Sequence, residues 1–161
     1  DTSIFIGQAV AASGTAMRNT LANIPQHKLI EFPVDEDVQM GFSIGLALTG
    51  LIPISIFPRW NFLLCAISQL VNHLDKVDVM SNGGYKTKAI IRTGIGSERP
   101  LHPQQQHVGD FTAAIQAMCT TIEVIRVAEP AEIFPAYQRA LLREDGRSTI
   151  VVEYGDYYGE K

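Results

Sequence analysis

Six short apolar segments, separated by stretches of helical character, constrain the fold of this chain most. They are rich in Ile and Val, and several are apolar throughout, which is typical of parallel strands buried on both faces of a sheet. The expected strands are Ile4–Ile6, Lys28–Phe32, Ile52–Phe57, Lys88–Arg92, Ile122–Val127 and Thr149–Tyr154. The expected helices are Thr15–Asn23, Glu36–Thr49, Asn61–Leu74, Phe111–Met118 and Ala131–Arg143. This alternation predicts an α/β domain with a mostly parallel sheet and helices on both faces.

The composition narrows the class of protein. With 161 residues, 46% of them hydrophobic and 19% charged, the chain is expected to fold into one globular domain. A net charge of −4 without a Lys/Arg cluster disfavours a nucleic-acid partner. The most apolar stretch, Met40–Phe57, is interrupted by three glycines and Pro53. We therefore expect no membrane span, no signal peptide and a cytoplasmic location.

Two features of the chain concern its context. Cys65 and Cys119 lie far apart and in no metal-ligand spacing, so they are expected to be free, buried thiols. The chain begins at Asp1 and runs directly into an expected strand. We therefore expect a piece of a longer protein or a trimmed chain.

Glu36 carries the strongest functional signal. It follows the apolar segment Leu29–Val34 and opens the long apolar helix. An acid in this place can simply be a first-turn residue that stabilises the helix N-terminus. Beside so apolar a helix it can also lie in a dry setting, which suits a carboxyl group that exchanges a proton. Its neighbours Asp35 and Asp37 are expected to point elsewhere.

Three stretches connect Glu36 to a known family. They are Val34-Asp35-Glu36-Asp37-Val38-Gln39-Met40-Gly41-Phe42-Ser43-Ile44-Gly45, then Ile56-Phe57-Pro58-Arg59-Trp60-Asn61-Phe62, then Ala66-Ile67-Ser68-Gln69-Leu70-Val71-Asn72. Their order resembles the pyrimidine-binding domain of the transketolase-like thiamine-diphosphate enzymes, and above all the beta subunit of 2-oxo-acid dehydrogenases. The resemblance implies the thiamine-diphosphate-binding fold. It also implies that Glu36 hydrogen-bonds the pyrimidine ring of the cofactor and activates it.

The resemblance implies further cofactor contacts after the third expected strand. Phe62 matches the phenylalanine that stacks on the pyrimidine ring in that family, and Phe57 and Pro58 would line the same wall. Pro58 departs from the family, where a larger apolar side chain is usual. From composition alone, Phe62 is equally well a core residue at the start of a helix.

The irregular segment Gly94–Val108 is expected to lie beyond the end of a strand, where open α/β sheets bind ligands. In the family, a histidine in this loop handles protons of the substrate. His107, shortly before the helix Phe111–Met118, suits that position better than His102, and both stay open. Gln106 matches the glutamine before the family's histidine, whereas Gly109 does not match the one after it.

The family's Mg²⁺-diphosphate site uses a Gly-Asp-Gly motif, which this chain lacks. The resemblance therefore implies that residues 1–161 form a single pyrimidine-binding domain, without the diphosphate-binding and C-terminal domains and without metal ligands of its own. Thiamine diphosphate would be shared with a diphosphate-binding subunit or domain, and this partner would hold Mg²⁺. The expected assembly is a homodimer or a heterotetramer.

The implied activity is the decarboxylation of a small 2-oxo acid by an enzyme of which this chain is one part, inactive by itself. A ketol transfer of transketolase type, acting on a ketose, is the second hypothesis. The third is an assembly or regulatory domain of the same fold without catalysis.

Overall fold

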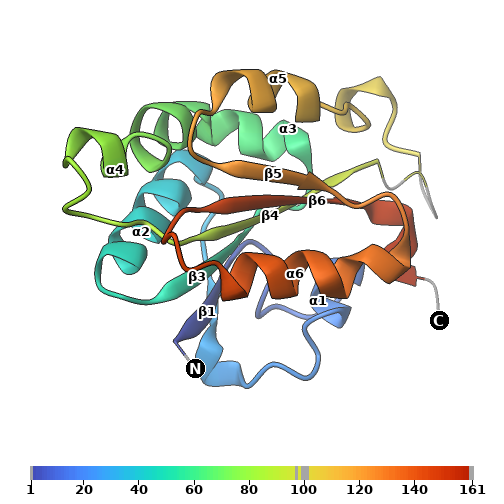
Figure 1. Cartoon of the computed structure of the whole chain (residues 1–161). Coiled ribbons are helices and arrows are strands. Elements are labelled where there is room, and N and C mark those ends of the chain that lie inside the picture. Colours follow the sequence, from blue (N-terminus) through green and yellow to red (C-terminus); the bar gives the residue numbers. More distant parts are fainter. Residues whose placement is uncertain (1, 97, 99–101, 160–161) are drawn as a thin grey trace.

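A parallel sheet of six strands forms the centre of the molecule (Figure 1). The computed structural model describes residues 2–96, 98 and 102–159. The strands lie in the order β2-β1-β3-β4-β6-β5, and every neighbouring pair is parallel. Their bounds are β1 Ser3–Gly7, β2 Leu29–Glu31, β3 Ile52–Ile56, β4 Ile90–Ile95, β5 Glu123–Arg126 and β6 Thr149–Tyr154. Each overlaps an expected strand, which confirms the predicted α/β fold.

Helices cover both faces of this sheet. Their bounds are α1 Ala16–Asn19, α2 Glu36–Leu48, α3 Trp60–Leu63, α4 Val77–Met80, α5 Thr112–Met118 and α6 Ile133–Leu142. Helices α2, α3 and α5 lie on one face, and α1 and α6 lie on the other (Figure 1). None of the helices in the described part of the chain has both the length and the apolar character that crossing a bilayer requires.

Alternate residues of the strands pack into two separate hydrophobic cores, one on each face of the sheet, because successive side chains of a strand point to opposite faces. Ile91 and Ile150 pack with the buried residues of α2, α3 and α5. Ile90 and Val151 pack with those of α1 and α6. This arrangement explains why apolar residues follow one another directly in the central strands, as in Ile90-Ile91 and Ile150-Val151-Val152, rather than alternating with polar ones.

The expected helix Asn61–Leu74 is broken into three windings. After α3, residues Leu64–Ala66 form a 3₁₀ turn and Gln69–Leu74 form a π-helical segment, which is followed by the unpredicted α4. The buried residues Leu63, Ala66, Leu70 and Leu74 keep one apolar face against the sheet throughout. The spacing of these four residues is that of one helix face, while the winding departs from the single α-helix expected from the sequence.

Two smaller expectations were wrong. Helix α1 ends at Asn19 instead of Asn23, and the Thr20 hydroxyl donates to the Met17 carbonyl oxygen at 2.7 Å. Such side-chain bonds to the backbone compete with helix propagation. Both cysteines are free, but neither is fully buried as expected: Cys65 is exposed and Cys119 is half-buried.

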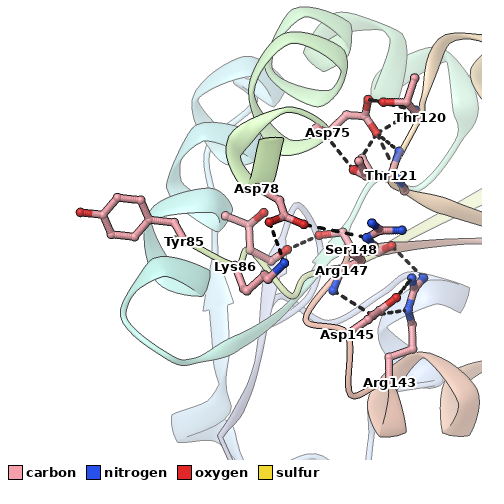
Figure 2. A network of polar contacts seen from close by, with 12 residues as sticks. Asp75, Asp78, Tyr85, Lys86, Thr120, Thr121, Arg143, Asp145, Arg147 and Ser148 are labelled. Atoms are coloured by element: carbon pink, nitrogen blue, oxygen red, sulfur yellow. Dashed lines mark hydrogen bonds and ion pairs between the residues drawn. The ribbon is translucent and has the colours of Figure 1, made fainter. Parts of the chain in front are cut away.

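A dense polar cluster joins the segments that lead into the amino-terminal ends of β4, β5 and β6 (Figure 2). We call it the amino-edge network; it comprises Asp75, Asp78, Lys86, Thr120, Thr121, Arg143, Asp145, Arg147 and Ser148. The Asp75 side chain is fully buried and accepts hydrogen bonds from the backbone N–H groups of Thr120, Thr121 and Ile122 at 2.7–3.0 Å. Lys76 Nζ donates to the same carboxylate at 2.6 Å.

The electrostatics of Asp75 follow from these donors. Burial by itself would raise the pKa of Asp75, but the bonds from Lys76 and from the backbone of Thr121 and Thr120 outweigh it and hold the pKa well below its ordinary value. Ser148 continues the network, since its hydroxyl accepts from Ala89 N at 3.1 Å and donates to the Thr87 carbonyl oxygen. At this end of the sheet, the buried polar side chains of Asp75 and Ser148 thus have their hydrogen-bond partners.

Candidate functional site

Glu36 begins α2 at the opposite, carboxyl-terminal edge of the sheet. Its side chain is buried, with 8% of its surface exposed. Gln8, which directly follows β1, donates from Nε2 to Glu36 Oε1 at 3.0 Å. No described residue hydrogen-bonds the second oxygen, Oε2. The carboxyl ends of β1 and β2 therefore bring together a buried carboxyl group and an amide that orients it.

The neighbouring acids point elsewhere, as expected. Asp35 is the N-cap of α2 and accepts from Val38 N at 3.1 Å. Asp37 is exposed and accepts from Gln69 Nε2 at 3.3 Å. Asp35 therefore caps the N-terminus of α2, and the Glu36 side chain is not needed for capping.

Gln39 fixes the first turn of α2 to the end of β3. It is 1% exposed and donates from Nε2 to Ser55 Oγ at 3.1 Å and to the Ile56 carbonyl oxygen at 3.0 Å. Its Oε1 atom is buried, and no described residue hydrogen-bonds it. These contacts place the Glu36 turn beside the segment that follows β3, which carries Phe62.

Phe62 meets the long loop at this edge. The rings of Phe62 and His107 lie 5.5 Å apart between centroids, with 37° between their planes. Arg59 Nη1 donates to the His107 carbonyl oxygen at 3.1 Å and ties the loop to the start of α3. His107 Nδ1 and Asn61 Oδ1 are buried and have no hydrogen-bond partner among the residues that the structure describes. Unpaired buried polar atoms are uncommon in folded proteins and mark places where a ligand could supply the partner.

The two candidate histidines differ in their surroundings. His102 is exposed; its Nδ1 accepts from Gln104 N at 2.9 Å, and its Nε2 lies 3.6 Å from Glu98 Oε1. His107 instead contacts Phe62 and is half-buried. The geometry thus associates His107 with the expected cofactor contact and leaves His102 in the outer part of the loop.

Pro58 and Phe57, the two residues expected to line the wall of the pyrimidine site, differ in their exposure. Pro58 is half-buried, whereas Phe57 is 1% exposed and packs in the core with Trp60. Phe57 therefore supports the site from behind and offers a ligand almost no surface. Three pockets of the described part, with volumes of about 330 to 470 Å³, are lined mainly by residues of α6 and its surroundings, and neither Glu36 nor Phe62 lines any of them.

Gln8, Gln39 and Asn61 are the site residues that sequence reasoning missed. Gln8 carries one recoverable signal, because it is the first residue after a parallel strand, where such sheets place their functional side chains. Gln39 looks from the sequence like any polar residue inside a helix. Among the described residues, no group of His, Cys, Asp and Glu lies close enough together to hold a metal ion.

Comparison with known proteins shows the family of this chain. The family described as "Transketolase, pyrimidine binding domain" matches residues 1–158. The beta subunit of the pyruvate dehydrogenase E1 component from Ascaris suum is 30% identical over 134 residues, covering 83% of this chain and 36% of that protein. The corresponding Caenorhabditis elegans subunit is 27% identical over 163 residues, covering 99% of this chain and 45% of that protein.

A solved structure shares the fold. The protein described as "Split gene transketolase, inactive beta4 tetramer" superposes with a TM-score of 0.70 at 15% sequence identity, covering 94% of this chain and 45% of that one. The chain thus spans less than half the length of these relatives. The match over residues 1–158, together with the all-parallel sheet, shows that this chain belongs to the family of transketolase pyrimidine-binding domains.

Proposed function

We propose that this chain is the pyrimidine-binding part of a thiamine-diphosphate enzyme that decarboxylates a small 2-oxo acid. The observation that carries this proposal is the buried Glu36 carboxyl group, oriented by Gln8 at the carboxyl edge of a parallel sheet. The family match and the relatives named as pyruvate dehydrogenase beta subunits support the reaction class.

The described side chains fit the aminopyrimidine end of the cofactor. Glu36 Oε2 is available for a hydrogen bond to a ring nitrogen, while Oε1 is held by Gln8. Asn61 Oδ1 and His107 Nδ1 are buried atoms in need of partners. Phe62 adds an aromatic face, on which a flat heterocycle can stack.

Each group has a definite task in this proposal. Thiamine diphosphate, when bound, supplies a thiazolium carbon that can lose a proton and attack a carbonyl carbon. Glu36 Oε2 would accept or donate the hydrogen bond to the pyrimidine ring and exchange one proton with it, while Gln8, bonded to Oε1, keeps the carboxyl group in place. His107 stands on the loop side and moves a proton at the substrate, for which an imidazole is well suited near neutral pH.

The diphosphate end and Mg²⁺ are assigned to a partner subunit or domain, with an assembly that is a homodimer or a heterotetramer. Helix α2 offers the surface for this contact, because Val38, Phe42 and Leu48 are exposed by 52%, 46% and 46%. The exposed Gly45 leaves this surface open as well, because an added Cβ there would meet nothing within 4 Å.

Two substitutions test this interface in sedimentation experiments. Phe42→Glu on α2 should weaken association, and Phe134→Glu on α6 should not. The reverse result would place the interface on α6.

Ketol transfer remains the second candidate, since the matched family takes its name from transketolase. A domain that serves only assembly would give the Glu36–Gln8 hydrogen bond no catalytic role.

The cytoplasmic location stays a prediction, and several relatives are named as mitochondrial.

The decisive variant is Glu36→Gln in the complete enzyme. We expect turnover to fall by about 100- to 10,000-fold, because an amide cannot exchange the proton that a carboxyl group shares with the pyrimidine. Thiazolium proton exchange, followed by NMR in deuterated buffer, should slow as well, while the melting temperature stays close to that of the wild type. Asp37→Asn, in the same helical turn but exposed, is the matched control. Activity of Glu36→Gln within a few-fold of the wild type would refute the proposal.

A further inference from the structure

Glu31, the last residue of β2, binds the backbone of the loop that follows β1. Its Oε1 accepts from Ala9 N at 2.7 Å. Its Oε2 accepts from Ala11 N at 2.7 Å and from Ala12 N at 3.1 Å. Successive backbone N–H groups that converge on one carboxylate form a concave anion-binding turn. One side chain therefore defines the course of residues 9–12.

The start of this loop is fixed independently. A Cβ added to Gly7 would lie 2.4 Å from the Ile56 carbonyl oxygen, so only glycine fits there. Ala9 has a φ of +56°, which is unfavourable for a residue with a Cβ. The bond from Ala9 N to Glu31 offsets part of this cost. Between these two constrained positions lies Gln8.

Gln8 connects this fixed loop to the candidate site, because its Nε2 donates to Glu36 Oε1 at 3.0 Å. We propose that Glu31 is a positioning residue, which holds the loop after β1 so that Gln8 stays hydrogen-bonded to Glu36. This inference rests on the proposed function, because it gives Glu31 a role in cofactor activation. Glu31 itself touches neither cofactor nor substrate.

The charge of Glu31 agrees with this role. Burial would raise the pKa of Glu31, but the backbone N–H groups of Ala11, Ala12 and Ala9 outweigh it and hold the pKa below its ordinary value. The carboxylate is therefore ionised at neutral pH, as an acceptor of three N–H groups should be. Since Glu31 is exposed, solvent screens the pairing, and we assign it to geometry rather than to global stability.

A double-mutant cycle in the complete enzyme tests the proposal. Glu31→Gln should slow thiazolium proton exchange by about 10- to 100-fold, the cost of a small misplacement of a reacting group. The double variant Glu31→Gln/Gln8→Ala should be no slower than Gln8→Ala alone, because Glu31 acts through Gln8. Additive effects would overturn the proposal, since they are the mark of a separate structural role.

Glu132→Gln is the matched control, because Glu132 also accepts two backbone N–H groups, from Ala128 at 2.7 Å and Glu129 at 3.2 Å, far from the site. Its proton exchange rate should equal that of the wild type. Hydrogen–deuterium exchange gives a readout without turnover. In Glu31→Gln the amides of residues 9, 11 and 12 should exchange up to about tenfold faster, with β4 and β6 unchanged.

Glu31→Asp, which keeps the charge, should restore part of both effects and serves if Glu31→Gln fails to fold. If Gln8→Ala and Glu36→Gln slow thiazolium exchange but Glu31→Gln does not, this inference fails alone. If none of the three slows it, the proposed function fails and takes this inference with it.

Discussion

The two edges of the sheet differ in whether some of their buried polar atoms are paired by hydrogen bonds. At the amino-terminal edge, the carboxylate of Asp75 and the hydroxyl of Ser148 are saturated by hydrogen bonds (Figure 2). At the carboxyl-terminal edge, buried atoms of Gln39, Asn61 and His107 lack hydrogen-bond partners within the described part of the chain. Saturated networks stabilise a fold, whereas unpaired groups cost stability and are kept at places that bind something else. The difference supports placing the proposed site at the carboxyl-terminal edge, and it predicts that the amino-terminal edge contributes mainly to stability.

The largest effect should come from breaking the saturated edge. Asp75→Asn should lower the free energy of unfolding by about 3 kcal/mol, because three backbone N–H groups lose a charged acceptor. Urea unfolding at pH 7, followed by circular dichroism, measures it. The control is Asp78→Asn, whose partner Lys86 is 47% exposed, and it should cost at most about 1 kcal/mol. Equal losses in the two variants would contradict the ranking.

The same residue makes a prediction about pH. The pKa of Asp75 is lower in the folded chain than in the unfolded chain, so its stabilising contribution is complete above the unfolded value of about 3.9. The contribution is lost as the pH falls from there toward the folded pKa. The difference in unfolding free energy between wild type and Asp75→Asn should be constant from pH 7 to 5 and shrink below pH 4. A difference that grows on acidification would show the wrong sign.

At the carboxyl-terminal edge, His107→Ala should lower turnover of the complete enzyme by about 100-fold, the lower end for losing an acid–base group. Thiazolium proton exchange should stay fast, because Glu36 and Gln8 are untouched. His102→Ala should behave like the wild type in both assays. If only His102→Ala reduces turnover, the assignment of the two histidines is reversed.

A matched pair of buried hydroxyls should give the smallest effects and opposite signs. Thr93 is fully buried, and its Oγ1 atom has no hydrogen-bond partner in residues 2–96, 98 and 102–159. Thr93→Val should therefore be neutral or stabilise the chain by up to about 1 kcal/mol. Ser148→Ala should destabilise it by about 1 to 2 kcal/mol, since it leaves Ala89 N unpaired. Thermal unfolding of both variants decides the matter. If Thr93→Val lowered the stability as much as Ser148→Ala does, the proposed difference between the two edges would be contradicted.

Local patterns in the sequence determined most of the fold. The apolar runs predicted six strands buried on both faces, and the family resemblance carried by the residues around Glu36 singled out that acid. Both are properties of neighbouring residues along the chain, so they are visible before folding. The buried face of the segment from Leu63 to Leu74 was equally predictable from spacing, although its winding was not.

Only the tertiary structure decided which distant groups meet. It paired Gln8 with Glu36 across 28 residues and brought His107 rather than His102 to Phe62. It also buried Phe57 in the core and gave Asp75 its partners from a segment 45 to 47 residues away. These contacts depend on strand order and on the path of loops, which are set by packing of the whole chain and leave no local signal in the sequence.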